Sequence, residues 1–252
     1  MSIDLVLAKI IKDMAEAARL EAVSDIPRFL AARQISHIYH FTPLKNLVSI
    51  SKHGFLGRNT LESLSIEYSI SDPSRYEPVL DAICFSISTP NDLMANSKIR
   101  SGHEMVLLEI GDVEALLTSL TFISVPGNFG SSSLKSRLQQ WPEEFIGGMG
   151  LANLFNNEEL RNRYQIPVNE PTDPQSELLF LEPVPWNHVK RVLSPGSHGY
   201  ATQEVVREVL PKLPKGIVFQ SQDPGVFKEI NWKDDATSQE FFDRSWNETW
   251  RL

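Results

Sequence analysis

Residues 172–181 have the sequence TDPQSELLFL, in which a polar segment leads into a short apolar strand that begins at about Ser176. Strand side chains alternate between two faces, so Gln175 and Glu177 point to the same side. An amide and a carboxylate directed together into a cleft suit the binding of a sugar hydroxyl and of a nucleophile. The alternative is a solvated strand edge, because most glutamates lie on the surface. The remaining sequence has to decide between the two interpretations.

Two upstream segments also carry polar side chains on predicted strands. Residues 38–42 (IYHFT) predict a strand that contains His40, followed by a helix over residues 43–53 that Gly54 closes. Residues 82–89 (AICFSIST) predict a second strand, with two serines on one face and apolar residues on the other. Three predicted strands thus each present polar side chains.

This triplet of strands resembles the core of the ADP-ribosyltransferases and, more closely, the DarT family of DNA ADP-ribosyltransferase toxins. The resemblance spans most of residues 36–195. The matching stretches are Ile38–Gly54, Ile83–Met94, Glu104–Ile110 and Pro171–Val184, with a looser match around Asn128–Ser133.

The resemblance implies a fold of the α+β class, in which two small packed and mostly antiparallel sheets surround an NAD cleft with flanking helices. It implies that the first strand's His and the second strand's hydroxyls hold NAD. It also implies that the carboxylate of the third strand acts on the oxocarbenium-like transition state of ADP-ribose transfer. A loop over residues 57–78 would cover the NAD, and the proline-containing loop 165–175 would select the target.

One position departs from the thymine-modifying members of the family. They carry an Arg directly after the Pro that follows the second strand, where this sequence has Asn91. Two segments are more similar to the guanine-modifying branch. One is the pattern Ser-Ile-Ser-x-Pro-Asn-x-x-Met, followed by Lys98 and Arg100, and the other is Pro-Thr-Asp-Pro-Gln-x-Glu at residues 171–177. The sequence therefore favours guanine as the target base.

Each candidate site residue also has a structural interpretation. His40 could be a satisfied, half-buried histidine, Ser86 and Ser88 could bond to neighbouring backbone, and Asn91 could cap the following helix. The candidates are, for catalysis, Glu177 and Arg100; for NAD binding, His40, Thr42, Asn46, Ser86, Ser88 and Asn91; for substrate binding, Gln175 and Lys98; and for metal binding, none.

Composition is that of an ordinary globular protein, with 252 residues, 41% hydrophobic and 22% charged. The N-terminus lacks the basic start and apolar run of a signal peptide, and the only cysteine, Cys84, cannot form an internal disulfide. No apolar run approaches the roughly 20 residues that span a bilayer. We therefore expect a cytoplasmic protein in which Cys84 fills the core.

The net charge of −8 argues against broad, sequence-independent binding of duplex nucleic acid, which depends on many Lys and Arg contacts with phosphate. A local basic groove remains compatible with this charge. Three pairs could form one, although such a pair is more often a solvated face: Lys98 with Arg100, Lys135 with Arg137, and Arg161 with Arg163.

Periodicity and loop signals predict three regions. Residues 1–34 are expected to form a helical appendage and residues 227–252 a tail that packs on the core, and the resemblance implies an ADP-ribosyltransferase domain over residues 35–226. Apolar periodicity extends over residues 3–22, and packing explains the appendage better than contact with a partner does.

Three hypotheses of function follow from the residues and the resemblance. The first is an NAD-dependent mono-ADP-ribosyltransferase that modifies a nucleobase, guanine in single-stranded DNA. As a toxin, it would be paired with a macrodomain-type ADP-ribosyl hydrolase as antitoxin. The second keeps the chemistry but takes RNA or a protein as target, and the third is an inactive partner-binding module. An unpaired base suits the first hypothesis, because its edge is open to attack.

Overall fold

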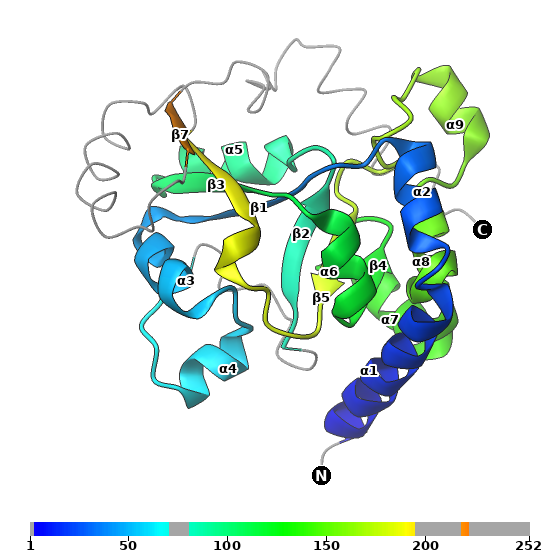
Figure 1. The fold of residues 1–252 in the computed structure, drawn as a ribbon, viewed down its shortest axis with the longest axis horizontal. Helices are drawn as coiled ribbons and strands as arrows, with labels where there is room; N and C mark the ends of the chain where they lie inside the picture. Colours follow the sequence, from blue (N-terminus) through cyan, green and yellow to red (C-terminus); the bar gives the residue numbers. More distant parts are fainter. Residues whose placement is uncertain (1–2, 71–80, 195–217, 222–252) are drawn as a thin grey trace.

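The strands form one seven-stranded sheet with the order β4-β5-β2-β1-β3-β6-β7, in a computed structural model that describes residues 3–70, 81–194 and 218–221. All neighbouring strands are antiparallel except β6 and β7, which are parallel. The expected α+β class with a mostly antiparallel sheet is confirmed (Figure 1). The strands are β1 (Ile38–Pro43), β2 (Ile83–Ile87), β3 (Met105–Ile110), β4 (Phe122–Val125), β5 (Glu177–Phe180), β6 (Val189–Ser194) and β7 (Val218–Ser221).

The two sheets that were expected are two halves of this one sheet, which separate at a fork between β1 and β2. Strands β1 and β2 are paired only at Ile38–Ile87 and Tyr39–Ser86, whereas β1 pairs with β3 over its whole length. Beyond the Tyr39–Ser86 pair, β1 and β2 diverge, which leaves a half of β4, β5 and β2 and a half of β1, β3, β6 and β7. The two halves stay joined because the short β1–β2 ladder is kept.

Helices surround the sheet, with α1, α2 and α8 on one side of the view in Figure 1 and α3 and α4 on the other. The 3-10 helices are η1 (Leu44–Asn46), η2 (Pro142–Phe145) and η3 (Trp186–His188). The α-helices are α1 (Ile3–Ala22), α2 (Ile26–Arg33), α3 (Leu47–His53), α4 (Arg58–Ser63), α5 (Asp92–Arg100), α6 (Val113–Ser119), α7 (Ser132–Gln140), α8 (Gly147–Asn153) and α9 (Glu158–Arg163).

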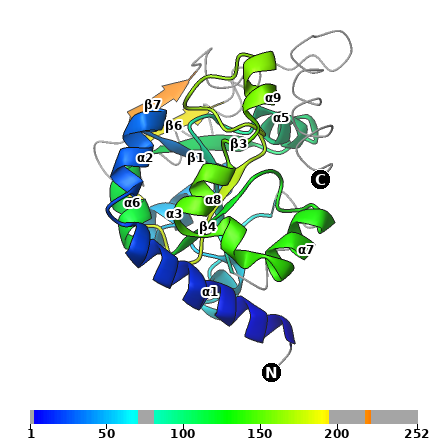
Figure 2. The ribbon, with the colours of Figure 1, turned by 90° about the vertical axis from the view of Figure 1, so that its right-hand side faces the viewer.

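Two hydrophobic clusters lie on opposite faces of the sheet. Phe85 of β2 belongs to the larger cluster and Cys84 to the smaller, as the alternation of strand side chains requires. Helix α1 contributes Ile11 to the smaller cluster and α2 contributes Leu30 to the larger. The N-terminal helices therefore pack on the core, as expected, and Figure 2 shows α1 lying along the outside of the molecule. The domain boundaries themselves stay predictions.

The helix after β1 ends at Gly54, as its sequence predicts. Gly54 has φ +74°, and a Cβ there would lie 2.7 Å from the carbonyl oxygen of Val184. Phe55 and Val184 also exchange backbone hydrogen bonds, from Phe55 N to Val184 O at 2.8 Å and from Val184 N to Phe55 O at 3.1 Å. A residue without a side chain is therefore required where the chain turns from α3 back against the sheet.

Several elements differ from the expectation. Strand β4 and helix α9 were not predicted, and α8 forms although its sequence, GGMGLAN, contains three glycines. Helix α4 lies within the segment 57–78, which was expected to be irregular. The tail at residues 227–252, expected to pack on the core, lies outside the described residues.

Candidate active site

A cleft with a cavity volume of about 140 Å³ opens where β1 and β2 diverge. The cleft is lined by β1, by the start of β2, by α3, α4 and α5, and by residues 68–70. Of the predicted site residues, those that line it are His40, Thr42, Asn46 and Lys98.

His40 is fixed at the fork by a hydrogen bond between its Nδ1 and the carbonyl oxygen of Cys84, at 2.9 Å. Because a carbonyl only accepts, Nδ1 carries the proton. The ring also contacts the rings of Phe55 and Phe85, with centroids 5.2 and 5.3 Å away. His40 therefore both holds the two strands together and lines the cleft, so it combines the structural and the functional interpretation.

Asn46 holds residues 66–70 against the wall of the cleft through hydrogen bonds to the backbone of Ser69. Its Oδ1 accepts a hydrogen bond from the backbone N–H of Ser69 at 2.6 Å, and its Nδ2 donates to the Ser69 carbonyl at 3.0 Å. Nδ2 also donates to Oγ1 of the buried Thr42 at 3.0 Å. The described part of the predicted covering loop thus lies against the cleft, whereas residues 71–80 lie outside the described residues.

Two cationic side chains enter the cleft from opposite helices, Arg58 from α4 and Lys98 from α5. Such a pair suits a diphosphate, with Arg able to bind two oxygens at once. Arg58 was not predicted, because nothing in the sequence brings residues 58 and 98 together. Next to them, burial raises the pKa of the Tyr68 hydroxyl, helped by its hydrogen bond to Glu62, which keeps Tyr68 neutral.

The polar residues at the end of β2 form a separate, buried cluster. The backbone N–H of Asn91 donates to Oγ of Ser86 at 3.2 Å, and Asn91 Oδ1 caps α5 by accepting from Met94 N at 3.1 Å. The capping role weighed for Asn91 is therefore present. Ser88 adopts φ +62°, and its buried hydroxyl has no hydrogen-bond partner among the described residues. None of these three side chains lines the cleft, although Asn91 caps the helix that carries Lys98 into it.

Glu177 begins β5 and is paired in register with Ser86, the last β2 residue before the fork. Neighbouring strands lie about 4.8 Å apart, so its Cα is one strand away from the closed end of the cleft. Its half-buried carboxylate accepts a hydrogen bond from the backbone N–H of Phe129 at 3.2 Å. The amide of Gln175 is buried and accepts from Asn128 at 3.3 Å. Both thus contact the loop after β4.

The loop 165–175 is held by Arg161, which was predicted only as part of a basic pair. The guanidinium donates to the carbonyls of Pro167 and Glu170, both at 2.8 Å, and to Oγ1 of Thr172 at 3.3 Å. It also lies over the ring of Phe155 at 5.4 Å. The buried Arg161 is therefore an anchor of this loop rather than part of a surface groove.

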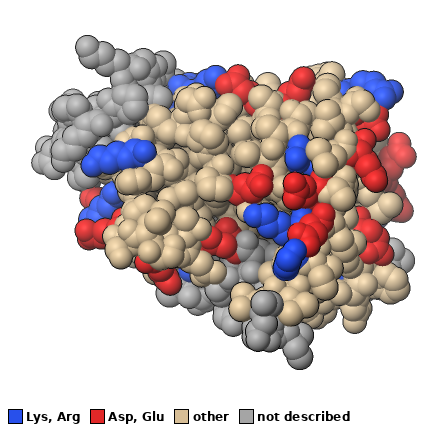
Figure 3. Space-filling view, turned by 60° about the horizontal axis from the view of Figure 1, so that its bottom comes forward, with Lys and Arg blue, Asp and Glu red and all other residues tan. Residues whose placement is uncertain are grey.

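Among the described residues, the remaining members of the predicted basic pairs do not line the cleft. Arg137 pairs with Glu144, Arg163 pairs with Glu159 at 3.4 Å, and Arg100 is exposed at the end of α5 and does not line the cleft. Figure 3 shows a face on which basic and acidic side chains are interspersed. The catalytic role expected of Arg100 stays a prediction.

Metal ligands and membrane spans were searched for over residues 3–70, 81–194 and 218–221. Within these ranges, no three His, Cys, Asp or Glu side chains are placed to hold a metal ion. In the same ranges, no helix has the length and apolar character needed to cross a bilayer.

No family model matches the sequence, and no curated protein matches it. Similar solved structures include Thermosipho africanus DarTG in complex with ADP-ribose, 13% identical with a TM-score of 0.45, over 79% of this chain and 54% of that one. This chain thus spans about half the length of the Thermosipho chain. Thermus sp. 2.9 DarT in complex with NAD+ is 15% identical with a TM-score of 0.41, over 73% of this chain and 95% of that one. The same protein in complex with ADP-ribosylated ssDNA is 16% identical with a TM-score of 0.41, over 73% of this chain and 94% of that one. At such identities and TM-scores, the likeness assigns no role to any residue of this chain.

Proposed function

We propose that this chain is an NAD-dependent mono-ADP-ribosyltransferase that modifies a nucleobase, with guanine in single-stranded DNA as the acceptor. The observation that carries the proposal is the fork between β1 and β2. This fork opens a cleft lined by His40, Asn46 and Lys98, and the strand that begins with Glu177 is the next neighbour of β2 in the sheet. The resemblance of the same three strands to the DarT family supports the assignment of these groups.

The residues of the cleft fit a dinucleotide. Arg58 and Lys98 supply two positive charges for its diphosphate, and the Thr42 hydroxyl and the His40 imidazole supply polar contacts for a ribose and an amide. In the transfer, the bond between nicotinamide and the ribose breaks, and nicotinamide leaves with the bonding electron pair. The acceptor atom forms the new bond to the ribose carbon and loses a proton.

Glu177 would act where positive charge develops on the ribose, since a carboxylate stabilises an oxocarbenium-like transition state. It could also take the proton from the acceptor. Because both effects belong to the transition state, Glu177→Gln should lower transfer by at least about a hundredfold while changing NAD affinity little. The matched control is Glu143→Gln, which alters an exposed carboxylate in η2.

The test is mass spectrometry of defined DNA and RNA oligonucleotides after incubation with the protein and NAD. We expect a mass increase of one ADP-ribose on guanine-containing single-stranded DNA, lost in Glu177→Gln and kept in Glu143→Gln. Oligonucleotides in which inosine, adenine or thymine replaces every guanine test the base. Modification of guanine-free DNA, or of RNA in preference to DNA, would refute the choice of guanine in DNA.

We also propose that the activity is that of a toxin, with a macrodomain-type ADP-ribosyl hydrolase as its antitoxin partner. Expression of the wild-type protein should arrest growth, and co-expression of such a hydrolase should restore it. Growth arrest that persists in Glu177→Gln would contradict a role based on transfer.

A further inference from the structure

The loop that follows β4, residues 126–131, turns back over the start of β5. Strand β4 ends at Val125, which is paired with Glu177, so the loop begins beside this carboxylate. The chain turns at Gly127, which has φ +137°. The next two residues of the loop form hydrogen bonds with the Gln175 amide and with the Glu177 carboxylate. These two side chains are therefore directed at the same loop and lie next to each other.

The side-chain amide of Asn128 can take only one orientation in this loop. Its Oδ1 accepts a hydrogen bond from the backbone N–H of Gly130 at 2.7 Å, and a backbone N–H can only donate. The atom of Asn128 that faces Gln175 is therefore Nδ2, which donates to Oε1 at 3.3 Å. Because an amide nitrogen does not accept, Gln175 has to turn its oxygen toward Asn128 and its Nε2 away from it. The N–H of Gly130 thus sets the orientation of both amides in turn.

The Nε2 of Gln175 is a hydrogen-bond donor that the described residues leave unused. It has no partner among them, and it is not one of their occluded, unpartnered polar atoms, which include the neighbouring Ser176 Oγ. Nε2 is therefore open to solvent. Its surroundings also lie at the surface, because Gly130 is exposed and Asn128 and Glu177 are half-buried. A ligand can thus reach this donor without a closed cavity.

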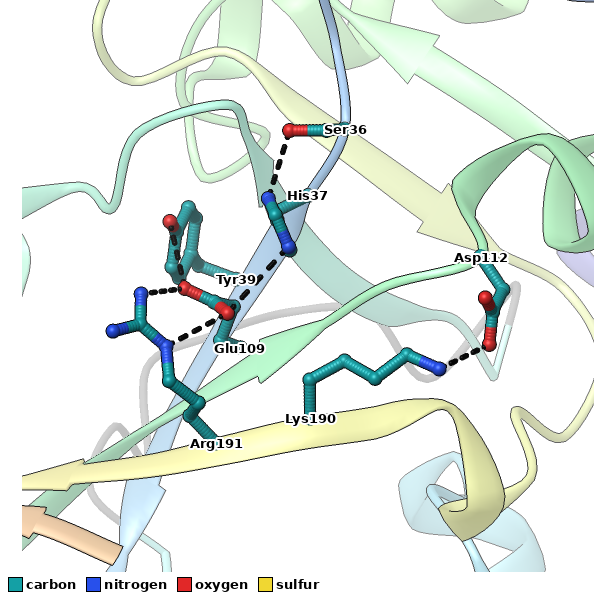
Figure 4. A network of polar contacts seen from close by, with 7 residues as sticks. All are labelled: Ser36, His37, Tyr39, Glu109, Asp112, Lys190 and Arg191. Atoms are coloured by element: carbon teal, nitrogen blue, oxygen red, sulfur yellow. Dashed lines mark hydrogen bonds and ion pairs between the residues drawn. The ribbon is translucent and has the colours of Figure 1, made fainter. Parts of the chain in front are cut away.

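The polar network around Glu109 is arranged in the opposite way (Figure 4). Tyr39 donates to Glu109 Oε2 at 3.2 Å, and Arg191 donates to Oε1 at 2.9 Å. The Nε2 of His37 lies 3.6 Å from the same oxygen. These side chains converge on one carboxylate that is only 4% exposed, so the network joins neighbouring strands. The two amides instead leave an oriented donor beside the candidate catalytic carboxylate.

We propose that Asn128 is a positioning residue, which holds the Gln175 amide so that its Nε2 donates a hydrogen bond to the acceptor nucleobase. This inference rests on the proposed function. A donor suits the O6 and N7 atoms of guanine, which accept, and does not suit the exocyclic amino groups of cytosine and adenine, which donate. Without Asn128, the Gln175 amide is free to present either end. Asn128 therefore contributes to the choice of base although it does not touch the base.

Asn128→Asp reverses the arrangement with almost no change in shape. One carboxylate oxygen still accepts from the Gly130 N–H, but the other now faces Gln175 as an acceptor. The Gln175 amide should then turn over, with Nε2 on the new carboxylate and Oε1 directed outward, where it meets the acceptor atoms of guanine. Gln175→Ala removes the amide altogether. The matched control Asn156→Asp adds the same charge at an exposed asparagine between α8 and α9.

The measured quantity is the partition of ADP-ribose, which is the amount of modified oligonucleotide per nicotinamide released from NAD while water and single-stranded DNA compete. A partition does not depend on the fraction of active protein. We expect it to fall about tenfold to hundredfold in Asn128→Asp and about threefold to tenfold in Gln175→Ala. The double variant should return to the value of Gln175→Ala, because Asn128 acts through Gln175. Asn156→Asp should match the wild type.

An unchanged partition in Asn128→Asp or in Gln175→Ala would overturn the inference. A double variant lower than both single variants would overturn it as well, since the added charge would then act without Gln175. If the wild type releases no nicotinamide from NAD, the proposed function fails, and the positioning by Asn128 is judged by hydrogen exchange alone. Exchange of the Gln175 Nε2 protons with water, measured by NMR, should be about tenfold slower in Asn128→Asp than in wild type, because these protons then bond a charged acceptor. Equal exchange rates would refute the positioning.

Discussion

Replacing Arg161 by Met should destabilise the protein by about 3–4 kcal/mol. The change removes three hydrogen bonds from a charged donor. The two of 2.8 Å, to Pro167 O and Glu170 O, contribute about 1.5 kcal/mol each, a low value for a charged donor because the released carbonyls can turn to water, and the longer bond of 3.3 Å to Thr172 Oγ1 contributes little. Loss of the contact with the Phe155 ring adds up to about 1 kcal/mol. Met retains most of the apolar stem, so packing is largely kept.

For a chain of this size, this difference corresponds to a fall in Tm of about 6–16 °C. Calorimetry and urea unfolding of wild type and variant measure it, with Arg163→Met as the matched control two residues along α9. Arg163 forms an exposed pair with Glu159, so its loss should cost less than about 0.5 kcal/mol. Equal Tm values for the two variants would refute the interpretation of Arg161 as the anchor of loop 165–175.

Three further predictions concern the cleft and the contact between Asp112 and Lys190. Asn46→Asp keeps the acceptor for the Ser69 N–H but loses both donated bonds, so hydrogen exchange at residues 66–70 should become about tenfold faster while global stability changes little. His40→Ala should weaken NAD binding by about tenfold or more in isothermal titration, and equal affinities would remove His40 from the site. The hydrogen bond from Lys190 lowers the pKa of Asp112, so the pKa of this carboxyl is lower in the folded state than in the unfolded state. The resulting stabilisation is fully present above the unfolded-state pKa of about 3.9, and it is lost as the pH falls through the folded-state pKa. The stability difference between wild type and Asp112→Asn should therefore shrink when the pH is lowered below about 4, and a constant difference in acid unfolding would contradict this.

Local patterns predicted most of the elements that shape the cleft. The structure contains the helix predicted from the apolar periodicity of residues 3–22 and the strand predicted at residues 38–42. It also has Gly54, with a positive φ, at the end of the helix that follows this strand. Each depends on a signal contained within a few residues, such as side-chain periodicity or a positive φ. Strand β4 was missed because its four buried residues, FISV, are too few to show a period. Helix α8 was missed because burial against the core outweighs the low helix propensity of its glycines.

The site was predictable only where its residues are local to one strand or helix. His40, Thr42 and Asn46 follow one another around a single turn, and the structure places all three in the cleft. Arg58 joins them through tertiary contacts that no sequence spacing encodes. Arg161 was assigned to the surface because a pair of arginines on a short helix is usually solvated, whereas here one of the two turns inward to satisfy loop carbonyls.

The fork between β1 and β2 explains why His40 combines a structural role with a place in the candidate site. Parting two strands within a sheet leaves backbone groups without their ladder partners, and a buried unpaired carbonyl is costly. The imidazole of His40 bonds the Cys84 carbonyl beyond the last ladder pair, so the residue expected to contact NAD also stabilises the opening that admits it. Substitution of His40 should therefore change both NAD affinity and the stability of the fork. His40→Asn, whose amide retains a donor, separates the two effects: it should recover thermal stability relative to His40→Ala without recovering NAD affinity. Recovery of both together would mean that His40 acts on NAD only by keeping the cleft open.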